Sequence, residues 1–300
     1  MSSISIKAKI SKKLHRFDKF FWHHIPDKLF LRGIYLYHMK HWLNLSNPRR
    51  YTEKLQWLKL YNRDPLYTKL VDKAAMKDWV TEQLGPGYVI PIVGLYDSWD
   101  EINFNELPDQ FVIKCTHNCG VEICQDKATF DFIQGRRNIE ASLYSEYYMT
   151  SREWPYKNVP HKILIEEFMN DESGQGLVDY KFFCFDGEVK FMFIATDRNS
   201  SEETKFDFYD TEFNHLPIVN GHPNSAKRIK KPNNFDKMLS IARKLSKGFP
   251  HVRVDLFSAN GHIYVGELTF FHFSGIVPFE PETWDYKIGS WLKLPQKKLK

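Results

Sequence analysis

Residues 253–269 read RVDLFSANGHIYVGELT, two runs of alternating apolar residues around an Asn-Gly turn. This pattern predicts a β-hairpin. With a three-residue loop, we expect Asp255 to lie opposite Val265, with Glu267 next on the same face at a diagonal offset. The two carboxylates would suit a hard cation, and Arg253 beside them would suit a phosphate or carboxylate group. The alternative is a solvated face with a surface ion pair.

Length and composition narrow the class of protein. The chain has 300 residues, of which 42% are hydrophobic and 16% aromatic, enough for a compact, multi-lobed unit of enzyme size. No run of about 18 apolar residues predicts a membrane-spanning helix. Residues 1–13 lack the apolar core of a signal peptide, so we expect a cytoplasmic protein. The four cysteines contain no C-x-x-C pair, which favours reduced thiols over a zinc site.

The positive charge of the chain is concentrated at its N-terminus. Residues 1–50 hold seven Lys and four Arg against two Asp, whereas the other 250 residues hold 31 basic and 35 acidic groups. Aromatic residues alternate with these basic ones. The segment therefore predicts either peripheral contact of residues 1–22 with anionic lipid at the inner face of the plasma membrane, or core aromatics with a solvated basic rim. We expect no nucleic-acid binding, because no recognised motif accompanies the charge.

The remaining sequence predicts a helical first third followed by mixed elements. Helices are expected at 48–61, 67–84, 126–148 and 234–248, and strands at 89–93, 111–115, 121–124, 161–168, 180–185, 189–195 and 206–209.

Several polar residues occur at strand ends and turns in this order. Lys114 closes an apolar strand and precedes a polar turn that contains Gly120, an arrangement in which a lysine and backbone N–H groups hold a phosphate. Lys73 opens a helix about forty residues earlier. The strand that ends in EEFM (166–169) offers a backbone edge and apolar side chains to an adenine ring. Two charged residues open the next strand: Asp179 and Lys181.

Together these segments resemble the ATP-grasp family, and within it the TupA-like branch associated with bacterial surface polysaccharides. The resemblance covers residues 51–292 and rests on the phrases YTEKLQWLKLYNRDPLYTKLVDKAAMKDWV, IPIVGLYDSWDEINFNELPDQFVIKCTHNCG, ILIEEFM, DYKFFCFDGEVKF, VRVDLF, GHIYVGELTF and FEPETWDYKIGSWL.

The resemblance implies an α+β ATP-grasp fold that holds its nucleotide between two lobes. It divides the chain into a basic, aromatic helical region (1–70), the first part of the core (71–110), a small lobe with phosphate loop and adenine hinge (111–169), and a C-terminal lobe with the metal hairpin (170–300).

The resemblance also implies ATP and Mg²⁺ as cofactors. The implied contacts are Lys73 and Lys114 for the phosphates, Glu166, Glu167, Phe168 and Met169 for the adenine, Asp179 for the ribose, Lys181 and Arg253 for the γ-phosphate or acceptor, and Asp255 and Glu267 for magnesium. Two positions depart from the family pattern. Thr269 stands at the third metal position, where Asn is usual, and Gly120 is alone in a loop that is often glycine-rich.

The implied reaction joins a sugar (uronic acid) carboxylate, free or on a lipid-linked polysaccharide, to an amino acid or small amine through an acyl phosphate. No nucleophilic side chain is needed, which agrees with the absence of a Ser-His-Asp or Cys-His pattern; His117 and His272 are candidate acid/base groups. The alternatives are a phosphotransferase acting on a sugar or polymer hydroxyl, a glycosyltransferase, and a non-catalytic membrane-associated module. The absence of Asp-x-Asp weakens the glycosyltransferase alternative.

Overall fold

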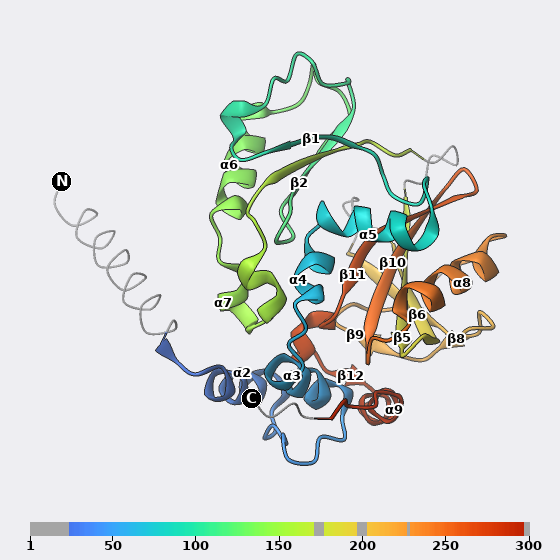
Figure 1. Ribbon diagram of the computed structural model, residues 1–300. Helices are drawn as coiled ribbons and strands as arrows, with labels where there is room; N and C mark the ends of the chain where they lie inside the picture. The colour runs from blue at the N-terminus through green and yellow to red at the C-terminus, as the bar shows by residue number, and fades with distance from the viewer. Residues whose placement is uncertain (1–23, 171–176, 197–202, 227–228, 297–300) are drawn as a thin grey trace.

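The computed structural model of the chain describes residues 24–170, 177–196, 203–226 and 229–296. These residues form two lobes, each built on an antiparallel sheet with helices packed against it (Figure 1). Helices and antiparallel sheets therefore combine as the predicted α+β class requires.

The small lobe contains a four-stranded sheet in the order β1-β4-β2-β3. Its strands are β1 Ile92–Tyr96, β2 Phe111–Cys115, β3 Val121–Cys124 and β4 Ile163–Glu167. Helix α6 (Phe132–Leu143) begins after Asp131, whose carboxylate accepts two backbone N–H groups of the first turn. Its buried Ile139 packs in one core with Phe111 and Ile113 of the sheet. This core is separate from that of the large lobe.

The large lobe contains a six-stranded sheet in the order β11-β10-β5-β6-β7-β8. Its strands are β5 Val178–Phe185, β6 Glu188–Thr196, β7 Lys205–Tyr209, β8 His215–Leu216, β10 Val252–Ala259 and β11 His262–Thr269. Helix α8 (Phe235–Ser246) packs its apolar side on β5, β6 and β10. Phe235 and Met238 of this helix are fully buried in a core shared with Phe182 and Leu256.

Two helices distant in sequence pack together on the large lobe. They are α3 (Tyr51–Tyr61) and α9 (Thr283–Trp291). Asp285 accepts hydrogen bonds from the backbone N–H of Thr52 at 2.9 Å and from its hydroxyl at 2.7 Å, which ties α9 to α3. The ring of Tyr51 contacts aromatic side chains of β5, so α3 is anchored to the sheet as well.

Shorter elements complete the two lobes. They are α2 Asp27–Met39, α4 Leu66–Val71, α5 Ala75–Leu84, α7 Tyr147–Ser151, η1 Trp99–Glu101, η2 Trp154–Asn158, η3 His272–Gly275, β9 Val219–Asn220 and β12 Phe279–Glu280. The helical periodicity over 67–84 is divided between α4 and α5. The opening predicted near Asp72-Lys73 is close to the start of α5, where the Asp72 carboxylate accepts the backbone N–H groups of Ala74 and Ala75, and the helix ends before Gly85 as predicted. The helix predicted at 126–148 is also divided, into α6 and α7.

The hairpin of β10 and β11 is present, but its predicted register is wrong. The turn has two residues, Asn260 and Gly261, both with positive φ, as a tight hairpin turn requires. A bulge at Gly266 then shifts the pairing, and Asp255 lies directly opposite Glu267. The two carboxylates are therefore closer neighbours than the diagonal offset implied.

The aromatic residues of the basic N-terminal region divide between core and surface. Tyr35 of α2 is fully buried, whereas Tyr37 and Trp42 are exposed. The membrane contact predicted for residues 1–22 lies outside the described residues. Among the residues that the structure describes, no helix is both long and apolar enough to cross a membrane.

Candidate active site

Lys73 connects the two lobes. It precedes α5, which lies between the two sheets in Figure 1. Its backbone N–H donates to Thr116 O at 3.2 Å, and its Nζ donates to Asn118 O at 2.6 Å in the predicted phosphate turn (116–120). The same Nζ lies 3.9 Å from Glu267 Oε1 on the hairpin. The sequence-predicted phosphate turn and metal hairpin are thus neighbours.

The phosphate turn is shaped by Asn118. Its Oδ1 accepts the Gly120 N–H at 2.9 Å, while its Nδ2 donates to Ser142 O at 2.6 Å and Ser145 Oγ at 3.0 Å. A Cβ at Gly120 would lie 2.5 Å from the side chain of Ser142, so glycine is required for the turn to approach α6 this closely.

Glu166 bridges two lysines. Its Oε1 lies 2.5 Å from Lys77 Nζ, and its Oε2 accepts from Lys114 Nζ at 2.5 Å. Burial raises the pKa of Glu166, but Lys114 and Lys77 together outweigh it and hold that pKa below its usual range. The Glu166 side chain therefore orients the ammonium groups of Lys77 and Lys114. An adenine at this position would have to contact the backbone of Glu166.

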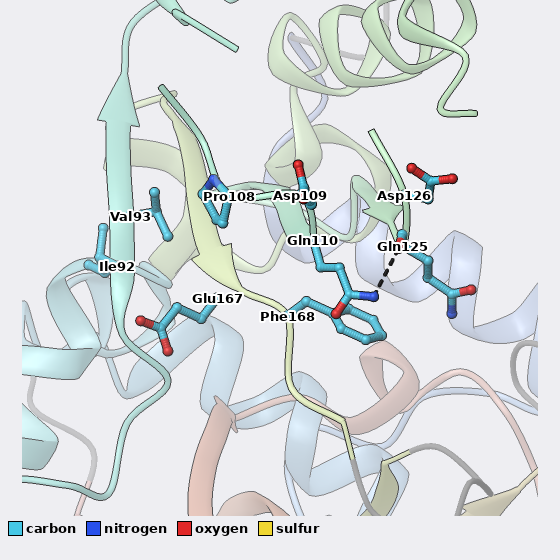
Figure 2. A pocket seen from close by; sticks show the side chains of 9 residues that line it. All are labelled: Ile92, Val93, Pro108, Asp109, Gln110, Gln125, Asp126, Glu167 and Phe168. Carbon is cyan, nitrogen blue, oxygen red and sulfur yellow. Dashed lines mark hydrogen bonds between the residues drawn. The ribbon is translucent and has the colours of Figure 1, made fainter. Parts of the chain in front are cut away.

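The end of β4 borders a cavity of about 880 Å³. Its walls come from the ends of all four strands of the small sheet, and Glu167 and Phe168 lie on one side of it (Figure 2). Gln110 closes another side by donating to Gln125 O at 2.9 Å. Met169 is half-buried and follows Phe168 outside the lining.

Asp255 is the most heavily engaged carboxylate of the hairpin. It is 1% exposed, and Arg253 donates to both of its oxygens at 2.7 Å. Lys181 Nζ donates to Oδ2 at 2.5 Å and lies 3.2 Å from Asp179 Oδ2. Burial raises the pKa of Asp255, but Arg253 and Lys181 outweigh it, and the net shift is downward. Asp255 is accordingly ionised at neutral pH.

Arg253 extends this network to the loop after β11. It donates to Thr269 Oγ1 at 3.0 Å and to His272 Nδ1 at 2.7 Å. Because a guanidinium only donates, Nδ1 of His272 accepts, and its Nε2 donates to Asn220 Oδ1 at 2.8 Å. Burial, followed by the charge of Arg253, holds the pKa of His272 well below its usual range. His272 is therefore a neutral partner of Arg253.

His117 is also buried and neutral. Burial, followed by the charge of His161, lowers the pKa of His117 to about 4, and the two rings stack with centroids 3.6 Å apart. Its Nε2 lies 3.2 Å from Ser145 O, behind the phosphate turn. Both candidate acid/base histidines are thus uncharged at neutral pH, and each hydrogen-bonds neighbouring groups of the protein.

The hairpin fits a magnesium ion that takes most of its ligands from a nucleotide. Within the described part of the chain, no group of three or more His, Cys, Asp or Glu side chains converges as a metal site. Asp255 and Glu267 instead form a pair of facing carboxylates, and Mg²⁺ commonly binds one or two carboxylates together with substrate phosphates. The hydroxyl of Thr269 accepts a hydrogen bond from Arg253.

Sequence reasoning missed three residues that organise this site: Lys77, Asn118 and Asn220. Lys77 lies one helical turn after Lys73, and this spacing on a predicted helix was a usable signal. Asn118 occupies a polar turn in which side-chain to backbone hydrogen bonds are common, so it was also open to prediction. Asn220 comes from a two-residue strand far along the chain, and nothing local indicated its contact with His272.

Comparison with solved structures returned ligases at low sequence identity. D-alanine–D-alanine ligase from Helicobacter pylori is 15% identical, over 81% of this chain and 69% of that one, with a TM-score of 0.44. L-amino acid ligase from Bacillus licheniformis is 14% identical, over 75% of this chain and 50% of that one, with a TM-score of 0.44. D-alanine–D-alanine ligase from Bacillus anthracis is 17% identical, with a TM-score of 0.38, and this chain covers 55% of its length.

Comparison with curated proteins returned no match. The family model described as TupA-like ATPgrasp matches residues 53–293, which include every candidate site residue named above. This match confirms the resemblance drawn from the sequence and, with the two antiparallel sheets, the ATP-grasp fold. The chain belongs to the TupA-like ATP-grasp family.

Proposed function

We propose that this chain is an ATP-dependent carboxylate–amine ligase. In this proposal it joins a uronic acid carboxylate of a surface polysaccharide, free or lipid-linked, to an amino acid or small amine. The observation that carries the proposal is the convergence of Lys73, Lys181 and Arg253 on the facing carboxylates Asp255 and Glu267. Membership of the ATP-grasp family supports ATP as the substrate that activates the carboxylate.

In this proposal each residue has a separate role, which follows from its position. Lys73 and Lys114, held by the phosphate turn and by Glu166, bind the phosphates of ATP. Asp255 and Glu267 would hold a magnesium ion, which would offset the charge of the terminal phosphates. Lys181 stabilises the γ-phosphoryl group as the substrate carboxylate attacks it, and ADP leaves.

Arg253 acts in the second half of the reaction. The amine attacks the acyl phosphate, negative charge develops on the carbonyl oxygen, and phosphate leaves as the amide forms. Arg253 is held by Asp255, Thr269 and His272, so its guanidinium is oriented before charge develops. The neutral state of His272 keeps this contact attractive.

The test measures ADP release by the purified chain with ATP and Mg²⁺. The proposal expects release to require glucuronate and a mixture of amino acids together, with an amide as the second product. ADP release that needs a sugar hydroxyl and no carboxylate would contradict the proposal and favour a phosphotransferase.

A further inference from the structure

Glu153 is a buried carboxylate that the reaction described so far does not use. It lies between α7 and η2 and is 3% exposed. Its Oε1 accepts hydrogen bonds from the hydroxyls of Ser151 and Ser274. Among the described residues, no group donates to its second oxygen, Oε2, and none forms an ion pair with it. Burial accordingly raises the pKa of Glu153, since its charge lacks a direct partner.

Two tyrosines lie beside this carboxylate. The rings of Tyr147 and Tyr156 contact edge to face, with centroids 4.8 Å apart. Neither hydroxyl has a hydrogen-bond partner among the residues that the structure describes. The backbone N–H of Tyr156 donates to Glu153 O at 3.2 Å, so Tyr156 and Glu153 belong to one turn, and Tyr147 lies against Tyr156. The charge of Glu153 is also the largest cause that raises the pKa of Tyr147. Glu153, Tyr147 and Tyr156 thus form one cluster of neighbouring side chains.

This cluster borders the proposed active site. The charge of Glu267 contributes to the raised pKa of both tyrosines. The η3 loop makes the same connection through hydrogen bonds, because Ser274 donates to Glu153 while His272, two residues earlier, accepts from Arg253.

We propose that Glu153, Tyr147 and Tyr156 bind the ammonium group of the amine substrate. The proposal rests on the ligase function proposed above. An ammonium has three N–H donors, and the cluster offers three polar atoms without partners. The carboxylate matches the positive charge, and the tyrosine rings add cation–π attraction. The bound nitrogen then lies on the side of Arg253, where the oxyanion of the acyl phosphate develops.

The charges that face Glu153 are compatible with a bound cation. Lys59 of α3 is the basic group on that side, and its Nζ donates to Ser151 O at 2.9 Å and Ser274 O at 2.8 Å. Burial lowers the pKa of Lys59 to about 8, and its Nζ hydrogen-bonds these two carbonyl oxygens and not the Glu153 carboxylate. Glu267 adds a second negative charge that favours an ammonium.

Glu153 also receives a proton in the reaction. The ammonium gives one proton to Oε2, and the lone pair thus freed forms the C–N bond with the acyl carbon. The C–O bond to phosphate breaks, and the second proton of the nitrogen leaves with the phosphate as HPO₄²⁻. The third remains on the amide nitrogen, so atoms and charges balance.

The test compares two nucleophiles with the full chain, ATP, Mg²⁺ and glucuronate. Hydroxylamine is largely uncharged at neutral pH and traps an acyl phosphate as a hydroxamate without needing an ammonium site. A mixture of the common amino acids supplies ammonium groups. In Glu153→Gln we expect the ratio of amide to hydroxamate to fall at least about tenfold, because a charge-assisted contact is lost.

Matched variants separate this role from a structural one. Ser151→Ala removes a hydrogen bond to Oε1 and keeps the carboxylate, so its ratio should stay within about twofold of wild type. Tyr147→Phe, at a half-buried position, should lower the ratio even where Glu153→Gln fails to fold. An unchanged ratio in Glu153→Gln or in Tyr147→Phe overturns the ammonium site alone. A wild-type chain that forms no hydroxamate overturns the ligase proposal, and the ammonium site with it.

Discussion

Asp255 and Glu267 face each other across the hairpin but differ in what surrounds them. Asp255 is buried between Arg253 and Lys181, whereas the side chain of Glu267 is 33% exposed. Asp255→Asn should therefore remove ATP turnover and also lower the free energy of unfolding by about 3 kcal/mol, since two buried cations lose their partner. Glu267→Gln should remove turnover with a stability change below about 0.5 kcal/mol.

Urea unfolding and ADP release, measured on the same preparations, check this difference. Equal stability of the two variants would mean that the ion pairs of Asp255 add nothing to the fold. Near-normal turnover in either variant would remove that carboxylate from the proposed metal site.

Lys59 should make stability depend on pH above neutrality. Burial lowers its pKa in the folded state to about 8, against about 10.4 in an unfolded chain. Between these values the unfolded state binds a proton that the folded state has lost, so stability rises with pH. The cost of the buried charge is fully present below pH 8 and is relieved above it.

Relative to Lys59→Met, the wild-type chain should gain up to about 3 kcal/mol of unfolding free energy between pH 7.5 and pH 10. Urea unfolding of both proteins at the two pH values measures this gain. Subtracting the values of the variant removes the contribution of other titrating groups. A difference between the proteins that is constant or shrinks with pH would contradict the prediction.

At the scale of elements, the hairpin was predictable and its bulge left a signal in the sequence. Its buried positions on β11 are Ile263, Val265 and Leu268, so the spacing changes from two residues to three at Gly266. A strict alternation would have kept the spacing at two. The expected register ignored this change, and the two carboxylates were consequently offset by one pair.

The bulge should matter more for activity than for folding. A Cβ at Gly266 would overlap the ring of Phe257, so Gly266→Ala should displace the strand that carries Glu267 and lower turnover by about tenfold or more. Gly261→Ala is the matched control, because the turn has open space around a φ of +79°. It should lower stability by about 1 kcal/mol and leave the register unchanged.

Kinetics of ADP release and urea unfolding of both variants provide the comparison. Full activity in Gly266→Ala would show that the position of Glu267 tolerates a shifted bulge.

Local chemistry explains which other elements could be predicted. The strands 111–115 and 121–124 were placed at their true ends, because a polar turn with a glycine separates two apolar runs. The contact between Arg253 and His272 was not predictable. It depends on a loop in which Phe273 and Ser274 both have positive φ, a conformation that neither residue type indicates.

At the scale of the molecule, α2 and the loop that follows it expose apolar and basic side chains to solvent. Leu29, Tyr37 and Trp42 are 62%, 71% and 76% exposed. Arg32 and Lys40 are exposed as well, and Lys40 Nζ lies 4.8 Å from the centre of the Tyr37 ring. Aromatic and basic side chains together suit the headgroup region of an anionic membrane.

The double variant Tyr37→Ser with Trp42→Ser should reduce co-sedimentation with phosphatidylserine-containing vesicles several-fold and leave ADP release intact. Wild-type binding should also weaken with salt, since each exposed basic residue adds about 1 kcal/mol near such a surface. Uncharged phosphatidylcholine vesicles are the control. Equal sedimentation of the variant and wild type would assign this face to another contact.

The bridging of Lys77 and Lys114 by Glu166 has a consequence for competing anions. The site holds nearly as many negative as positive side chains: Glu166, Asp179, Asp255 and Glu267 against Lys73, Lys77, Lys114, Lys181 and Arg253. The electrostatic field of the site is therefore largely cancelled before a nucleotide binds, and free orthophosphate gains little binding free energy there. A nucleotide that brings its own divalent cation can engage both signs at once. We therefore expect weak inhibition by orthophosphate and ready departure of the phosphate that each turnover releases.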